Sequence, residues 1–263
     1  LTSVYAHTPG EGIELRVSVF DNAYTDGSPE MVAESFPAVR LVRSEDNLGF
    51  GAGNDRLAET SDADLLLLLN SDTILTEDVI SPLADELLAS EQIAIAAPRL
   101  EFPDGELQLS SLSFPTLRYE LVRTFNGTPL QRFASTKTVE RIEQVDLVDD
   151  RAARDTDFVW ATCWLIRRED PDLQPIFDPA FPMYDEDLDT CRRLRDRGRR
   201  VRYVPSVTLI HLGGKSAPTR QRFQLAAAGR RRYFRRQHGA LAAAAYAAMK
   251  APGALAARVN RSG

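Results

Sequence analysis

The chain has 263 residues, 43% of them apolar and 27% charged, which is the composition of an ordinary globular protein with one large α/β domain or one domain with an appendage. Its formal net charge of −6 argues against a general nucleic-acid binder, because such proteins need excess cationic side chains to displace counterions from phosphate. Cys163 and Cys191 form no CxxC pair and no signal peptide is visible, so we expect a reducing cytoplasm. The sequence begins at Leu1 rather than at Met, and we expect its natural N-terminus to lie upstream.

The first part of the chain alternates predicted strands and helices. Strands are predicted over 13–20, 39–43 and 93–97, and a helix over 78–89. The five leucines at 65–69 are bounded by polar residues, a pattern typical of a strand buried on both faces of a parallel sheet. This alternation, with short connections, predicts an α/β fold with a doubly wound, mostly parallel sheet flanked by helices.

The second part of the chain is less regular. Residues 101–155 contain three prolines and are predicted to form a partly helical excursion rather than a separate domain. We therefore divide the chain into an α/β domain over 1–216 and a basic, alanine-rich helical extension over 217–263. The later elements are predicted, in chain order, as a buried strand at 158–166, a helix at 186–197, strands at 201–204 and 207–210 around Pro205, and a basic helix at 218–238.

Three acidic residues follow predicted strands. Asp21 and Asp26 lie in the turn after the first strand, and Asp72 closes the triplet Asn70-Ser71-Asp72 after the leucine strand. In doubly wound sheets, ligands bind beyond the carboxyl ends of the strands. A polar turn that caps a helix explains such residues equally well, but carboxylates placed there also suit a hard divalent cation that bridges a diphosphate.

A second acidic group stands at the start of the 186–197 helix. Residues 185–189 contain four carboxylates, which the helix dipole favours in a first turn but which also repel one another. A carboxylate here is suited to accept a proton from an attacking hydroxyl.

Two glycine-rich stretches resemble phosphate loops only loosely. His211 ends a strand before Gly213, Gly214 and Lys215, but the segment lacks the P-loop spacing. Gly49, Gly51 and Gly53 do not match the dinucleotide fingerprint, so the sequence disfavours a Rossmann dehydrogenase.

The order of these motifs resembles the large inverting glycosyltransferase family 2 with the GT-A fold, and most closely its rhamnosyltransferase-like branch. The similar region spans roughly 1–216, although the family's first strand is absent. The motifs are Asp21-Asn22 with Asp26-Gly27-Ser28, Asn47-Leu48-Gly49-Phe50 with Gly53-Asn54, Leu68-Leu69-Asn70-Ser71-Asp72, Leu165-Ile166-Arg167-Arg168, Phe177-Asp178 followed by Phe181, Met183-Tyr184, Glu186-Asp187 and Asp189, Tyr203-Val204-Pro205-Ser206, and His211 with Gly213-Gly214 and Ser216.

The resemblance implies a role for each matched residue. Asp187 matches the general base, and Glu186, Asp189 and Trp160 match acceptor-side or supporting positions. Asp72 and His211 match ligands of a Mg²⁺ or Mn²⁺ ion. The residues implied to surround the nucleotide-sugar are Asp21, Asn22, Asp26, Asn47, Gly49, Asn54 and Asn70.

Two positions depart from the branch. Ala161 stands where a glycine is usual, so an added methyl group is expected to narrow the acceptor site. Gln174-Pro175-Ile176 replaces a Gly-Gly turn before Phe177.

The implied reaction moves a sugar from a nucleoside-diphosphate-sugar to a hydroxyl of a glycan or a lipid-linked acceptor. Deoxythymidine-diphospho-rhamnose is the first candidate donor, and uridine-diphospho sugars are the second. Two alternatives stay open: a GT-A-like nucleotidyltransferase, and a non-catalytic module that binds sugar nucleotides or polysaccharide. The sequence indicates no oligomeric state.

The basic extension has two interpretations. Arg230–Arg236 form either a solvated helix face or a contact with the anionic inner surface of the cell membrane, with Tyr233, Phe234, Leu241 and Tyr246 entering the lipid. No stretch of the extension is apolar enough for a membrane span.

Overall fold

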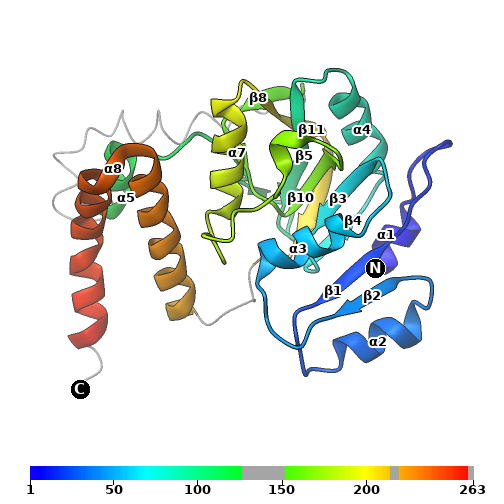
Figure 1. Ribbon diagram of the computed structural model, residues 1–263, viewed down its shortest axis with the longest axis horizontal. Coiled ribbons are helices and arrows are strands. Elements are labelled where there is room, and N and C mark those ends of the chain that lie inside the picture. The colour runs from blue at the N-terminus through cyan, green and yellow to red at the C-terminus, as the bar shows by residue number, and fades with distance from the viewer. Residues whose placement is uncertain (126–151, 214–218, 260–263) are drawn as a thin grey trace. The chain divides into compact units, whose positions relative to one another are not determined.

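The computed structural model describes residues 1–125, 152–213 and 219–259 (Figure 1). It divides into two compact units: Leu1–Leu112 with Asp150–Ser216, and Ser113–Asp149 with Ala217–Gly263. The second unit takes up Ala217, the first residue of the predicted extension, but it also includes Ser113–Asp149, which had been predicted to belong with the α/β domain. The first unit contains α1 (Thr2–Ala6), β1 (Ser18–Asp21), α2 (Ser28–Ser35), β2 (Arg40–Arg43), α3 (Phe50–Glu59), β3 (Leu65–Leu69), β4 (Thr73–Leu75), α4 (Ile80–Leu88), β5 (Ile93–Glu101), β6 (Leu107–Gln108), β7 (Ser111–Leu112), β8 (Arg154–Thr156), β9 (Phe158–Val159), β10 (Cys163–Arg167), the 3₁₀ turn η2 (Pro171–Leu173), α7 (Glu186–Asp196) and β11 (Arg200–His211).

A mixed sheet forms the centre of the first unit. Its strand order is β3-β10-β5-β11-β4, with β6 paired to β5 and β8 paired to β11. Within it only β5 and β11 run parallel, and the remaining pairs are antiparallel. The prediction of a mostly parallel sheet is therefore wrong. The reason is that β10 returns after the long 101–155 excursion and inserts antiparallel between β3 and β5.

The leucine strand has the predicted bounds but a different environment. β3 spans Leu65–Leu69 and lies at the edge of the sheet, paired only with β10 among the described strands. Leu68 is buried, whereas its four neighbours in the strand are partly exposed. The prediction of a strand buried on both faces of a parallel sheet is wrong here, because a run of leucines records apolarity and not the number of neighbouring strands.

Strands β1 and β2 form a separate two-stranded parallel sheet, in which Val19 pairs with Leu41. Helix α2 packs on β2, and α3 packs on β1. The predicted strand over 13–20 was too long at its start, because β1 begins only at Ser18.

Several predicted boundaries shift in the later strands. The two strands predicted around Pro205 are one strand, β11, with a register irregularity between Val204 and Thr208 that accommodates the proline. β5 likewise continues through Pro98 to Glu101. The strand predicted at 158–166 is broken into β9 and β10 by Trp160, Ala161 and Thr162.

The two faces of the mixed sheet are covered differently. Helix α4 packs its buried Leu83 and Leu87 on the face that carries Cys163 and Leu165. Because side chains alternate along a strand, Trp164 and Ile166 point to the opposite face. There Phe177 stacks on Trp164, with ring centroids 5.6 Å apart.

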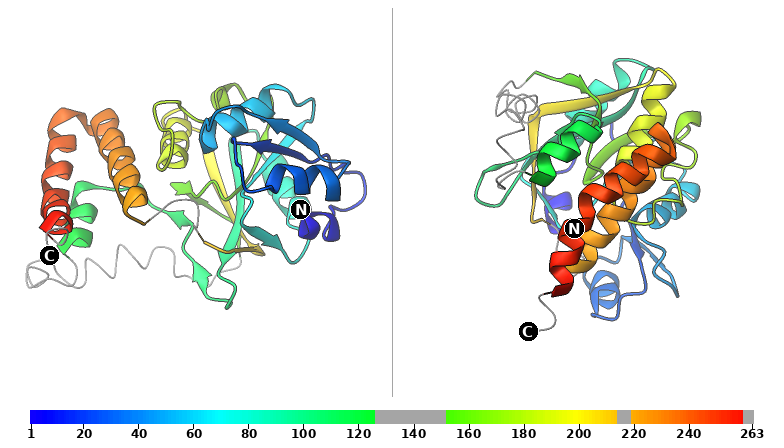
Figure 2. Two further views of the ribbon diagram at one scale, coloured as in Figure 1. Left: turned by 90° about the horizontal axis from the view of Figure 1, so that it is seen from below. Right: turned by 90° about the vertical axis from the view of Figure 1, so that its left-hand side faces the viewer.

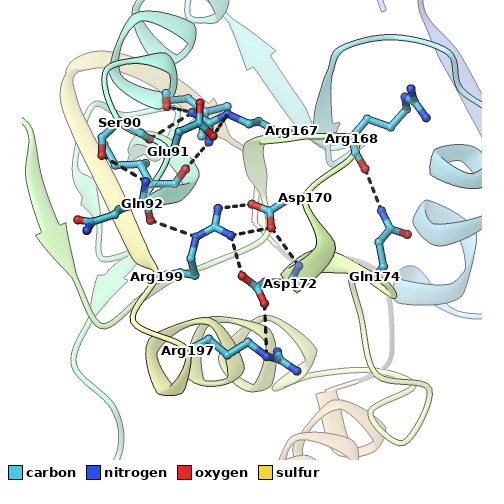
Figure 3. Close-up of polar contacts among 12 residues, drawn as sticks. Ser90, Glu91, Gln92, Arg167, Arg168, Asp170, Asp172, Gln174, Arg197 and Arg199 are labelled. Carbon is cyan, nitrogen blue, oxygen red and sulfur yellow. Dashed lines mark hydrogen bonds and ion pairs between the residues drawn. The ribbon is translucent and has the colours of Figure 1, made fainter.

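An ion-pair network ties together the loops at one end of this sheet (Figure 3). Arg199 precedes β11 and binds both carboxylate oxygens of Asp170, whose side chain is 1% exposed; it also donates to Asp172 Oδ2 at 2.7 Å. Arg167, at the end of β10, donates to the carbonyl oxygens of Leu87, in the last turn of α4, and of Ser90, just after α4. Every charge in this network has a partner, so it anchors η2, α4 and the start of β11 to one another.

The described part of the second unit contains α5 (Leu117–Phe125) and α8 (Thr219–Val259). Gly239, with φ of 84° and ψ of 179°, is non-helical and divides α8 into two helices that fold back on each other (Figure 2). Arg230 and Lys250 come from these two helices and bind the buried carboxylate of Glu120 on α5, at 2.5 and 3.1 Å.

The apolar residues of α8 correct one prediction. Tyr233 and Phe234 are fully buried, Tyr246 is 5% exposed, and the rings of Phe234 and Tyr246 lie 5.3 Å apart. These three aromatic residues form the core between the two helices and do not project outward to a membrane; of the predicted lipid-facing set only Leu241, 88% exposed, projects outward. Among the residues that the structure describes, no helix is long and apolar enough to cross a bilayer. Lys215, Ser216 and Arg261 lie outside the described residues, and the side chains of Arg220, Arg222 and Arg258 are not described either.

Candidate functional site

The predicted site residues of β3, β10 and β11 meet at the end of the sheet opposite the ion-pair network. Cys163 at the start of β10 pairs with Leu69 at the end of β3, and the amide of Asn70 donates to the carbonyl of Thr162. His211, the last residue of β11, pairs with Thr73 of β4. This pairing brings the Asn70-Ser71-Asp72 triplet, the Trp160–Thr162 segment and His211 to one edge.

Asp72 and His211 form the candidate metal pair. His211 Nε2 lies 3.3 Å from Asp72 Oδ1, and the amide of Leu212 donates to the Asp72 carbonyl. The pKa of the Asp72 carboxyl is lowered, chiefly by its contact with the His211 ring, so this carboxylate is ionised at neutral pH. Within the described ranges no group of three or more His, Cys, Asp or Glu residues converges on a metal position.

The residues at this edge fit a divalent cation. A carboxylate oxygen and an imidazole nitrogen are suitable ligands for Mn²⁺. Asn70 Oδ1 is buried and has no hydrogen-bond partner, which is the condition expected of an acceptor arranged for a ligand. The turn itself is held by the hydroxyl of Thr73, which donates to the Asn70 carbonyl oxygen at 2.7 Å.

His211 has a second partner that the motifs did not reveal. Its Nδ1 lies 2.5 Å from the side-chain oxygen of Gln108 on β6, and both side chains are buried. No sequence motif includes Gln108, because this residue lies in the 101–155 excursion.

The predicted base occupies the first turn of α7. Asp187 is partly exposed, and its Oδ2 faces the amide nitrogen of Ala161 at 3.4 Å. Trp160, next to Ala161, is 36% exposed, and its backbone amide donates to the Ser110 carbonyl. A reachable carboxylate beside an exposed indole ring is suited to meet a sugar hydroxyl.

Glu186 differs from Asp187 although it adjoins it. The side chain is buried, and Oε2 has no hydrogen-bond partner. Burial, reinforced by the negative charge of Asp187, raises the pKa of Glu186 from 4.5 to about 8, so the carboxyl is mostly protonated at neutral pH.

Asp189 holds the local structure together. It is fully buried and pairs with Arg193 at 3.2 Å, while Arg193 also donates to the Ile176 carbonyl at 2.8 Å. Of the two roles that the resemblance left for Asp189, this geometry fits the supporting one. Tyr184 and Asp185, which lead into the helix, both have positive φ, a conformation that costs free energy for residues other than glycine.

The predicted nucleotide-sugar residues shape one loop. Asn22, directly after β1, accepts from the Leu48 amide at 3.1 Å and donates to the Gly49 carbonyl at 3.3 Å. Asn47 accepts from the Gly49 amide at 3.0 Å. Asp21 is mostly buried and accepts from the Tyr24 amide at 3.1 Å.

The side chains of two other residues in that predicted set form hydrogen bonds with their own helix or turn. Asn54 donates to the carbonyl of Phe50 within α3 at 2.9 Å. Asp26 accepts from the Ser28 amide, and hydrogen bonding to Ser28 lowers its pKa. Their side chains thus organise the starts of α3 and α2.

The loop and the base region are in direct contact. A Cβ atom on Gly49, whose φ is 84°, would lie 2.6 Å from the Pro182 carbonyl oxygen, and one on Gly51 would lie 2.8 Å from Phe177 Cβ. Asp55 on α3 accepts the amides of Ile176 and Phe177, so it fixes the Gln174–Phe177 turn, whose Gln174–Pro175 peptide is cis. Asp55 is a second residue that the motifs did not reveal.

Comparison with known proteins identifies the chain's relatives. A curated N-acetylglucosaminyl-diphospho-decaprenol L-rhamnosyltransferase of Mycobacterium tuberculosis is 27% identical over 210 residues, which are 75% of this chain. The chain spans 66% of the length of that relative.

Solved structures show the fold. GalNAc-T7, solved with UDP, GalNAc and Mn²⁺, aligns with a TM-score of 0.59 at 13% identity over 89% of this chain and 44% of that chain. The mannosyltransferase PcManGT from Pyrobaculum calidifontis, solved with GDP-Man and Mn²⁺, aligns with a TM-score of 0.54 at 17% identity over 97% of this chain and 70% of that chain. The described α/β architecture is thus that of GT-A glycosyltransferases. The sequence profile described as "Glycosyl transferase family 2" matches residues 1–170, and this chain belongs to that family.

Proposed function

We propose that the chain is an inverting, metal-dependent glycosyltransferase that moves a sugar from a nucleoside-diphosphate-sugar to an acceptor hydroxyl. The observation that carries the proposal is the partly exposed Asp187 carboxylate in the first turn of α7, just after the Phe177–Pro182 segment that packs against the Asn47–Asn54 loop. Family membership and the ionised Asp72 beside His211 support the same reaction.

The chain's residues divide the work between the two reactants. Asp187 accepts the proton of the acceptor hydroxyl as its oxygen attacks C1 of the sugar from the face opposite the diphosphate. The bond from C1 to the diphosphate oxygen breaks, its electrons leave with the nucleoside diphosphate, and the configuration at C1 inverts. Asp72 and His211 would hold the cation, which when bound supplies the positive charge that stabilises the leaving diphosphate.

For the specific substrates we propose deoxythymidine-diphospho-rhamnose as donor and a lipid-linked sugar as acceptor. The support is the mycobacterial relative, whose name describes the transfer of rhamnose to N-acetylglucosaminyl-diphospho-decaprenol. Uridine-diphospho sugars are the alternative donors.

A donor panel tests the reaction class. We expect Mn²⁺-dependent release of nucleoside diphosphate from one donor, and calorimetry should show that this nucleoside diphosphate binds only with Mn²⁺. Binding without turnover would favour a sugar-nucleotide-binding module. Release of pyrophosphate from a nucleoside triphosphate and a sugar phosphate would favour a nucleotidyltransferase.

We also propose a peripheral contact with the anionic inner face of the cell membrane, through α8. Arg231 and Arg235 are exposed on its first helix, and Leu241 projects at the start of the second. Each arginine near an anionic surface contributes about 1 kcal/mol, or about fivefold in binding.

Vesicle flotation with and without phosphatidylserine tests this contact. We expect binding that requires the anionic lipid and that weakens in R231Q/R235Q, whereas the matched variant R16Q, on the first unit, binds like the wild type. Equal flotation with neutral vesicles would sink the idea.

A further inference from the structure

His211 and Gln108 are brought together by the sheet, although they are distant in the sequence. Leu100 on β5 pairs with Gln108 on one side and with Leu209 on the other. Residues directly paired across strands share a face, as do residues two apart in one strand. The Gln108 side chain and the His211 ring therefore project from the same face, where they meet at 2.5 Å.

The chemistry of this contact places a proton on the Nδ1 atom of the His211 ring. The side-chain oxygen of Gln108 has lone pairs and no hydrogen, so His211 Nδ1 donates to it. The amide nitrogen of Gln108 lies toward Gly213, 3.9 Å from the position of a Cβ there. The opposite ring nitrogen, Nε2, makes the longer of the two contacts, at 3.3 Å from Asp72 Oδ1.

A ring that binds a cation through Nε2 must release the Nε2 proton and keep the Nδ1 proton, and its Nε2 lone pair then faces the carboxylate of Asp72. Two electron-rich atoms that face each other attract a positive charge between them. The contact is 8% exposed at His211 and 5% at Gln108, so water does not readily replace the amide as acceptor. Loss of that acceptor would free the ring to rotate or to carry its proton on Nε2, where it blocks a cation.

We propose that Gln108 is a positioning residue: it holds the His211 proton on Nδ1 and thereby commits Nε2, together with Asp72, to a divalent cation. The inference rests on the proposed metal-dependent transfer and names the residue that prepares its cation site. Removal of such an outer partner of a metal ligand typically costs 10- to 100-fold in metal affinity.

The first experiment measures Mn²⁺ affinity by calorimetry, without donor or acceptor. We expect Q108L to bind Mn²⁺ about 10- to 100-fold more weakly than the wild type. Q108E retains an acceptor for Nδ1–H and should bind within a few fold of the wild type or more tightly. S110A, which alters a buried polar group two residues away without touching His211, should bind like the wild type. Unchanged affinity in folded Q108L, or loss of affinity in Q108E as large as in Q108L, overturns the proposal.

The second experiment measures the tautomer of the His211 ring directly, in the wild-type protein, so its result does not depend on whether a variant folds. Long-range ¹H–¹⁵N correlation of the metal-free wild type at alkaline pH reports the tautomer of each histidine, and the chain contains three. We expect His211 with its proton on Nδ1, and a proton on Nε2 instead overturns the proposal. Neither experiment requires turnover, so a protein with the expected tautomer and Mn²⁺ affinity but no donor cleavage would refute the proposed function alone.

Discussion

Buried oxygen atoms of side chains differ between the two ends of the mixed sheet in whether they have hydrogen-bond partners. At one end Asp170 is almost completely buried, and both of its carboxylate oxygens bind Arg199. At the other end Glu186 Oε2 and Asn70 Oδ1 are buried with no partner at all. A buried polar group without a partner costs free energy, so the second end is maintained against stability. This comparison assigns the anchoring of the loops to the first end and agrees with the ligand site proposed at the second.

The largest expected effect is a loss of turnover, without loss of donor binding, when Asp187 is replaced at the end of the sheet that holds the candidate site. Asp187→Asn removes the proposed base but keeps the shape of the side chain, so turnover should fall by about 10²- to 10⁴-fold while Mn²⁺-dependent donor binding changes little. Initial rates of donor cleavage and calorimetry measure the two quantities. Near-normal turnover would remove Asp187 from its role.

A substitution at the opposite end should show the reverse pattern. Arg199→Met leaves the Asp170 charge buried and unpaired, and we expect the free energy of unfolding to fall by about 3–5 kcal/mol. Urea unfolding measures the loss, and donor cleavage per folded molecule should stay at the wild-type rate. Arg16→Met is the matched control, because the Arg16–Asp62 pair is exposed and is worth less than about 1 kcal/mol. If the two variants lost equal stability, the ion-pair network would not be the anchor.

The next effect concerns pH at the ligand end. Between pH 4.5 and about 8 folded Glu186 holds a proton that the unfolded chain has released, so its contribution to stability is lost as pH rises through this window. The slope approaches roughly 1.4 kcal/mol per pH unit and sums to a few kcal/mol. Glu186→Gln does not titrate, so its stability relative to the wild type should increase up to about pH 8 and then level off.

Urea unfolding at pH 5, 7 and 9 measures this difference. Glu106→Gln, a substitution on an exposed side chain, is the control and should show the same pH dependence as the wild type. A pH-independent difference between Glu186→Gln and the wild type would show that Glu186 is ionised in the folded protein.

The sequence predicted where strands and helices begin and end better than it predicted which strands pair with one another. The leucine pattern predicted the bounds of β3 to the residue. The position of β3 at a sheet edge, however, depends on its pairing with β10, which follows more than ninety residues later in the chain. Pro205 suggested a break between strands, whereas the irregular pairing with β5 allows β11 to continue past it. Pairing partners are set by tertiary contacts that no local pattern records.

The candidate site shows the same limit. Asp187 and Asp189 look alike in the sequence, but successive helical positions turn by about 100°, so one is partly exposed while the other is fully buried against Arg193. The motif order paired Asp72 with His211, and the β4–β11 ladder places them 3.3 Å apart. Gln108 belongs to no motif and becomes visible only when β6 is aligned on β5.

The close approach of Gly49 to the Pro182 carbonyl has a thermodynamic consequence. No side chain fits between the Asn47–Asn54 loop and the segment that leads into α7, and Asp55 ties α3 to the same segment. A ligand that orders one of these segments therefore also shifts the conformational equilibrium of the other, and the coupling free energy is the same in both directions. Binding of the donor would thus change the affinity of the site for the acceptor, and binding of the acceptor would change the affinity for the donor by the same factor.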